Sequence, residues 1–205
     1  MRRTTAPAAS LYRQVLGTDF DLLAPELQRF HSMAGRVELS GKCSVEGPQS
    51  IAGRLLGAMF ALPKATSETL FRFELDADAR QETWRRHFPG RRMVSHMRVG
   101  KGMLAERFGP VKLHFKLEAD DGQLTMLLRS VTVFGIPAPS FLMPVVLAHE
   151  RGALGKLHFS VSARLPLLGR LAAYHGYLDL AKEARGNAEY SFSLRKRVSQ
   201  NDARL

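Results

Sequence analysis

The sequence predicts an α+β domain that is mainly antiparallel β, with a strongly curved sheet or barrel of about nine to ten strands. Two to three N-terminal helices are expected to cover one side of it. Apolar residues recur with helical spacing before residue 63 and alternate with polar residues from about residue 69 onward. No helical crossover interrupts the alternation, so parallel strands are excluded. An antiparallel sheet of this size usually curls, closes or splits into two layers.

Three helices are expected in the first third of the chain. Ser10 suits the N-cap of a short helix that ends at Gly17. Pro25 suits the first position of a second helix. A third helix is expected over residues 48–61, where apolar residues keep a spacing of three to four.

The remaining segments predict strands joined by tight turns. Residues 36–45 form the first strand, with Gly41 as a candidate β-bulge. The clearest alternation lies at residues 111–118, where valine, leucine and phenylalanine occupy one parity and charged or polar residues the other. Glycine-containing turns are predicted at residues 89–90, 100–102, 109–110, 120–122 and 152–155.

Length and composition fit one domain. The chain has 205 residues, of which 45% are hydrophobic and 24% charged, and these values exclude global disorder. We expect a flexible N-terminus at residues 1–9, a single β-rich domain at 10–197 and a flexible C-terminus at 198–205. Because no segment has the pattern of a transmembrane helix or a secretory signal, we expect a cytoplasmic protein.

The basic excess, 30 Lys and Arg against 19 Asp and Glu, gives a net charge of +11. Basic residues crowd residues 80–101, and 195–197 form a smaller cluster. Such a charge favours contact with nucleic acid or an anionic membrane. However, the basic residues are dispersed and no nucleic-acid motif accompanies them, so we expect solvated strand faces and only weak, non-specific binding of polyanions. The crowded residues are Arg80, Arg85, Arg86, Arg91, Arg92, Arg98 and Lys101.

Motifs for common chemistries are missing from the sequence. Gly100–Gly102 is too short for a dinucleotide-binding loop, and no histidine spacing is typical of a zinc site. Cys43, the single cysteine, excludes an intramolecular disulfide, and its apolar parity predicts an inert buried thiol. We therefore expect no cofactor and no metal.

Glu106 is the strongest candidate for a buried acid. It shares parity with Leu104 and Phe108, so it points into an apolar interior if that parity faces inward. Counting back from the turn at residues 100–102 places His96 opposite Glu106. The pair is either a structural ion pair or a site of proton transfer.

Residues 134–147 form an apolar, proline-rich segment that is too short to span a bilayer. As a loop it would form a lid over an apolar cavity or a surface for a partner. Burial against the helices is equally consistent with its composition. The sequence leaves these three interpretations open.

The order of several short motifs resembles an uncharacterised bacterial family that is known only as a domain of unknown function. That family occurs alone or C-terminal to oxidoreductases similar to saccharopine dehydrogenase. The resemblance implies no activity, cofactor or catalytic residue. It adds a separately encoded oxidoreductase as a candidate partner. The motifs are residues 11–17, 22–25, 27–31, 35–37, 84–88, 106–110 and 165–169, together with Arg92, Ser95, Tyr174 and Gly176.

These observations predict a module that binds a small hydrophobic or amphipathic molecule inside the curved sheet. Glu106, His96 and Arg107 are the predicted polar anchors, and Trp84 and Tyr174 the predicted walls. One alternative is a cofactor-free isomerase, cyclase or lyase that uses the Glu106/His96 pair. Another is an accessory domain that docks on an oxidoreductase. The sequence indicates neither the ligand nor the oligomeric state.

Overall fold

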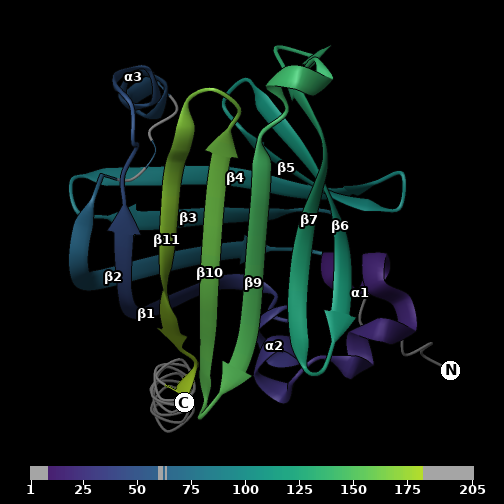
Figure 1. The fold of residues 1–205 in the computed structure, drawn as a ribbon. Coiled ribbons are helices and arrows are strands. Elements are labelled where there is room, and N and C mark those ends of the chain that lie inside the picture. Colours follow the sequence, from purple (N-terminus) through teal and green to yellow (C-terminus); the bar gives the residue numbers. More distant parts are fainter. Residues whose placement is uncertain (1–8, 60–61, 63, 182–205) are drawn as a thin grey trace, which may run out of the picture.

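A computed structural model of the chain describes residues 9–59, 62 and 64–181. Its strands form a closed antiparallel barrel, in which one layer of strands crosses behind the other (Figure 1). Ten strands close the ring in the order β6-β5-β4-β3-β2-β1-β11-β10-β9-β7, because β6 also pairs with β7, and β8 is a short addition to β7. The predicted mainly antiparallel barrel with short N-terminal helices is confirmed.

The helices are short and the strands long. The helical elements are α1 (Leu11–Leu16), η1 (Gly17–Leu22), α2 (Pro25–Phe30), α3 (Ile51–Met59) and η2 (Ser140–Leu142), of which η1 and η2 are 3₁₀ helices. The strands are β1 (Gly35–Glu46), β2 (Thr66–Ala77), β3 (Glu82–Phe88), β4 (Arg91–Gly100), β5 (Met103–Phe108), β6 (Val111–Asp120), β7 (Gln123–Val133), β8 (Ile136–Pro137), β9 (Val145–Ala153), β10 (Lys156–Leu165) and β11 (Gly169–Asp179).

Alternation along each strand decides which side chains fill the barrel. On β6, Val111, Leu113 and Phe115 are buried, whereas Lys112 and Lys116 on the other parity are exposed. On β3, every second residue from Glu82 to Phe88 is buried. Polar side chains therefore point into the interior together with apolar ones, where they occupy inward-facing positions of a strand.

The helices α1, η1 and α2 close one end of the barrel, and we call them the helical cap (residues 11–30) (Figure 1). Ser10 caps α1 and Pro25 begins α2, as predicted. The backbone NH of Ala24 donates to the carbonyl of Gly122 at 2.9 Å. Glu26 accepts a hydrogen bond from the backbone NH of Gly155 at 3.1 Å. The cap is thus fixed to the β6–β7 and β9–β10 turns.

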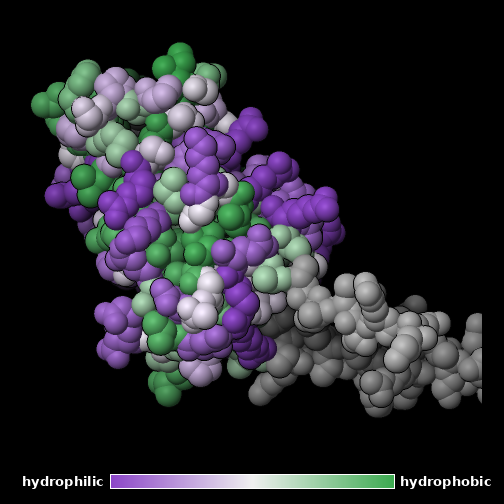
Figure 2. Space-filling view, turned by 90° about the vertical axis from the view of Figure 1, so that its right-hand side faces the viewer, coloured by the Kyte–Doolittle hydropathy of each residue, from purple (hydrophilic) through white to green (hydrophobic). Residues whose placement is uncertain are grey.

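The third predicted helix, α3, lies at the opposite end of the barrel (Figure 1). Ser50 accepts a hydrogen bond from the backbone NH of Gly53 and donates one to the carbonyl of Leu168, which joins α3 to the β10–β11 turn. Figure 2 shows hydrophobic residues at this upper end of the molecule. The two ends of the barrel are therefore built differently.

The predicted bulge at Gly41 is wrong. The pairing of β1 with β2 shifts between Cys43 and Val45 instead. Gly41 is required by the close approach of β11, since an added Cβ would overlap the carbonyl oxygen of Tyr177. Residues 1–8 and 182–205, which include most of the two predicted flexible ends and the 195–197 cluster, lie outside the described residues.

Candidate functional site

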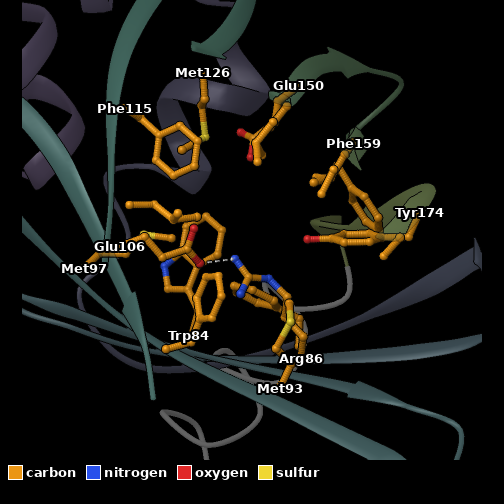
Figure 3. A pocket seen from close by; sticks show the side chains of 18 of the residues that line it. Trp84, Arg86, Met93, Met97, Glu106, Phe115, Met126, Glu150, Phe159 and Tyr174 are labelled. Carbon is orange, nitrogen blue, oxygen red and sulfur yellow. Dashed lines mark hydrogen bonds and ion pairs between the residues drawn. The ribbon is translucent and has the colours of Figure 1, made fainter. Parts of the chain in front are cut away.

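The barrel encloses a cavity of about 130 Å³. Aromatic and methionine side chains make up much of its wall, and four polar side chains interrupt it (Figure 3). A cavity of ~150 Å³ with apolar walls is large enough for a benzene-sized molecule. The apolar lining includes Phe71, Phe73, Trp84, Met93, Met97, Phe115, Met126 and Phe159, and the polar lining is Arg86, Glu106, Glu150 and Tyr174.

Arg86 and Glu106 form a buried ion pair across β3, β4 and β5. The Arg86 Nη2 lies 3.1 Å from Glu106 Oε1, and its Nη1 donates to Ser95 Oγ at 2.9 Å. The guanidinium carbon lies 4.8 Å from the centre of the Trp84 ring. Burial lowers the pKa of Arg86, but Glu106, with smaller contributions from Tyr174 and Tyr12, more than offsets this, so the pKa lies above its ordinary value. The Arg86 guanidinium is therefore held in its charged form.

The hydroxyl group of Tyr174 points from β11 into the cavity (Figure 3). Burial raises its pKa to about 12, so it remains protonated and can donate a hydrogen bond. Phe88 and Phe159 contact its ring at centroid distances of 5.6 and 6.1 Å. These contacts fix the direction of the hydroxyl.

A second buried pair joins the helical cap to the barrel. The Nε2 of His31, just after α2, lies 2.7 Å from Glu150 Oε2 on β9. The His31 ring also packs on Tyr12 at a centroid distance of 3.7 Å. Because Glu150 lines the cavity, the cap takes part in forming its wall.

Glu82 is a third buried carboxyl group, at the start of β3. Its Oε2 accepts a hydrogen bond from Trp84 Nε1 at 2.9 Å. Burial raises the pKa of Glu82, and the hydrogen bond from Trp84 lowers it only in part. Glu82 therefore adds a buried carboxyl group with a raised pKa to the region between cap and cavity.

Three of the five predicted site residues lie in the cavity wall, namely Glu106, Trp84 and Tyr174. His96 and Arg107 do not, because their side chains are exposed on the outer face. His96 donates to or accepts from Thr83 Oγ1 at 3.1 Å, and Arg107 donates to the carbonyl of Gly109.

The predicted pairing of His96 with Glu106 is therefore wrong. In the backbone pairing of β4 with β5, Glu106 lies opposite Met97, and His96 lies opposite Arg107. The hairpin closes through the two residues Lys101 and Gly102, both with positive φ, rather than through the three residues 100–102. One residue of register moves a side chain to the other face. Proton transfer by a Glu106/His96 pair is thereby excluded.

Arg86, Glu150 and His31 were not among the predicted site residues. Arg86 shares the parity of Trp84 and Phe88, so its inward direction could have been found, and its assignment to a solvated face is wrong. Glu150 shares the buried parity of Ala148. His31 follows a six-residue helix, and no local pattern relates it to Glu150, which lies 119 residues further along the chain.

Other candidate groups are placed as follows. Cys43 is buried, and burial raises the pKa of its thiol to about 11. Within the described residues, no group of three or more His, Cys, Asp or Glu side chains is arranged to hold a metal ion.

None of the helices in the described part of the chain has the length and apolar composition needed to cross a membrane.

Comparison with known proteins places the chain among domains whose function is not established. None of the curated proteins matched it. Among solved structures, the "Crystal Structure of Rv2717c from M. tuberculosis" is similar, with 12% sequence identity and a TM-score of 0.40, covering 77% of this chain and 98% of that one. The family described as "Domain of unknown function (DUF4166)" matches residues 23–178, which is most of the chain. The protein therefore belongs to the DUF4166 family.

Proposed function

We propose that the barrel binds a small molecule with an apolar body and one neutral polar group. The observation that carries the proposal is the cavity itself, in which the Arg86–Glu106 pair and the Tyr174 hydroxyl line an otherwise apolar wall. A buried ion pair is rarely better for stability than apolar side chains of the same volume. A few fixed polar groups in an otherwise apolar cavity are typical of a ligand site, because they orient the bound molecule.

The methionine side chains support an adaptable ligand site. Met93 and Met97 of β4 and Met126 of β7 line the cavity from two different strands. Their unbranched, polarisable side chains adjust to ligands of different shape. The apolar body of the ligand would contact these residues and the surrounding rings.

The charges around the cavity favour a neutral head group. Among its described lining residues, Arg86 is the one arginine or lysine, and Glu106 already balances its charge. Glu150 adds a second carboxyl group. A ligand carboxylate would meet this acidic wall, whereas a hydroxyl or carbonyl group could bind Tyr174 or the guanidinium at little electrostatic cost.

Two ligands with the same body test this preference. 4-Methylphenol and 4-methylbenzoate differ in the head group, and calorimetry compares their affinities. We expect the phenol to bind at least about tenfold more tightly, which corresponds to ~1.4 kcal/mol. Tighter binding of the benzoate, or no binding of either compound, would contradict the proposal.

Variants of two cavity residues test the anchors. Tyr174→Phe should weaken phenol binding about two- to tenfold, the value of one hydrogen bond. Tyr177→Phe is the matched control, because Tyr177 does not line the cavity.

Glu106→Gln keeps an acceptor for Arg86 but removes the negative charge, so the benzoate should gain affinity. An unchanged preference, with folding intact, would remove Glu106 from the site.

Docking on an oxidoreductase remains a separate proposal that rests on the family resemblance. Co-purification of the chain with such an enzyme would test it.

A further inference from the structure

Exposed apolar side chains gather at the α3 end of the barrel. Three segments form this end, residues 48–59, 134–145 and 164–170, and we call them the rim. Val145 pairs with Arg164, and Gln49 accepts a hydrogen bond from the backbone NH of Arg170, so the three segments adjoin one another. The exposed large apolar residues of the rim are Ile51, Leu55, Phe134, Ile136, Phe141, Leu142, Val145 and Leu167.

The degree of exposure is unusual for side chains of this kind. Phe134 is 81% exposed and Leu167 is 96% exposed. Both residues have positive φ and lie at the tips of turns. Single exposed apolar residues are ordinary, but a contiguous group of them marks an interaction surface. Figure 1 places η2 and α3 at this end of the barrel, and Figure 2 shows hydrophobic residues at the same end.

The charge of the rim has one sign. Its three segments contain Arg54, Arg164 and Arg170 and no Asp or Glu. Arg170 is paired with Glu46, at the end of β1. Arg54 and Arg164 are exposed. A partner of this surface must therefore accept apolar side chains together with cations.

A basic groove of about 920 Å³ continues from the rim onto the outer face of β4, β5 and β6. Arg98, Arg107 and Lys112 line it beside Phe134, and no carboxylate is among its described lining residues. Arg107 pairs with Lys112 across the two strands. Like charges directly opposite each other destabilise a sheet, so an anionic partner would relieve a repulsion that the fold retains.

We propose that the rim and this groove dock on the surface of membranes that contain anionic phospholipids. The apolar side chains would enter the headgroup and acyl-chain boundary, while the cations would contact phosphate and other anionic headgroups. Nucleic acid would contact the cations equally well but offers nothing to the aliphatic residues of the rim. The membrane is therefore the partner that uses both halves of the surface.

The cavity wall meets the same end of the barrel. Val146 and Ala163 line the cavity and are direct neighbours of the exposed residues Val145 and Arg164. Docking by the rim would therefore bring the apolar cavity close to the lipid phase. The docking itself depends on the surface alone and holds whether or not the cavity binds the ligands proposed above.

Vesicle co-sedimentation of the full chain tests the proposal. We expect binding to vesicles of phosphatidylcholine mixed with phosphatidylglycerol, and much weaker binding to phosphatidylcholine alone. Arg107→Gln/Lys112→Gln should weaken binding about 25-fold, since each basic residue near an anionic surface contributes about fivefold. Phe134→Ser/Ile136→Ser should weaken it by at least about tenfold without a change in charge.

Matched controls lie at the helical-cap end. Leu22→Ser/Leu154→Ser removes two exposed apolar residues there, and Arg13→Gln/Arg36→Gln removes two cations, the half-buried Arg13 and the exposed Arg36. Both controls should leave vesicle binding unchanged. Equal losses in controls and rim variants would overturn the proposal, as would the absence of binding to anionic vesicles.

Two further outcomes would also overturn it. One is loss of binding with the charge variants alone, together with equally tight binding of a single-stranded oligonucleotide, which would indicate a general polyanion surface. The other is a dimer in sedimentation velocity that the Phe134→Ser/Ile136→Ser variant dissociates, which would make the rim a self-association surface. Affinity for 4-methylphenol, measured on the same variants, should not change, so failure of docking and failure of the cavity proposal are distinguishable.

Discussion

At the helical-cap end of the barrel, Leu11, Tyr12 and Leu27 are fully buried, whereas at the α3 end Ile51 is 76% and Leu55 is 70% exposed. Both ends carry short helices rich in apolar residues. The difference lies in what the helices contact. The cap packs into the barrel mouth, while α3 contacts mainly β11. Apolar content alone therefore does not indicate whether a helix serves stability or contact with a partner.

Polar interactions follow the same division. At the cap, the buried His31–Glu150 pair connects the end of α2 to β9. At α3, the connecting hydrogen bonds run from Ser50 and Gln49 to the backbone of the β10–β11 turn and are more accessible to solvent. We expect the cap to unfold together with the barrel and α3 to open separately.

The largest effect is expected from His31→Leu. The substitution leaves Glu150 buried without its partner, which should lower the free energy of unfolding by about 3–5 kcal/mol. Denaturant unfolding followed by the fluorescence of Trp84, the single tryptophan, measures this loss, because the Trp84 ring lies 6.5 Å from that of His31. His149→Leu, on the outer face, should change stability by less than about 0.5 kcal/mol. Equal effects would mean that the pair does not hold the cap.

Truncation of one leucine at each end compares their packing directly. Leu27→Ala in α2 should cost about 2–5 kcal/mol, because it leaves a cavity in a fully buried site. Leu55→Ala in α3 should cost less than about 0.5 kcal/mol. Thermal and denaturant unfolding of the two variants give the comparison. A large loss for Leu55→Ala would show that α3 is part of the cooperative core.

The two serine N-caps sharpen the comparison. Ser10 accepts from the backbone NH of Arg13, and Ser50 from that of Gly53. Ser10→Ala should lower global stability by about 1 kcal/mol. Ser50→Ala should instead raise hydrogen exchange in α3 alone and leave global stability unchanged. Faster exchange throughout the barrel in Ser50→Ala would contradict separate opening of α3.

The smallest effect is expected in the pH dependence of the cap. Burial raises the pKa of Glu82 above its ordinary value of 4.5 in the folded state. The folded state therefore binds this proton more tightly, and the corresponding stability is lost as pH rises from about 4.5 through the folded pKa. Glu82→Gln should reduce this decline, measured as the free energy of unfolding from pH 4 to 8.

Glu118→Gln is the control for that measurement. Its carboxylate is exposed, and a hydrogen bond from Lys116 lowers its pKa, so its small contribution has the opposite sign. A Glu82→Gln variant with the same pH profile as the wild type would mean that Glu82 does not titrate in this range.

Much of the local structure could be predicted because its causes are local. The capping serine, the proline at the start of α2 and the glycine after α1 determine where the first helices begin and end. Alternation predicts which face of each strand is buried, and so the inward direction of Glu106 and Trp84. The inward direction of Arg86 follows from the same rule.

Only the tertiary structure decided the partners of these residues. The length of the 101–102 turn set the register that separates His96 from Glu106 and moves it to the outer face. Closure of β6 on β7, and the pairing of His31 with Glu150, depend on contacts between distant segments that no local pattern encodes. The sequence by itself therefore determined the elements and the buried faces, since these follow from neighbouring residues. The cavity and the contrasting ends of the barrel arose only when packing brought distant residues together.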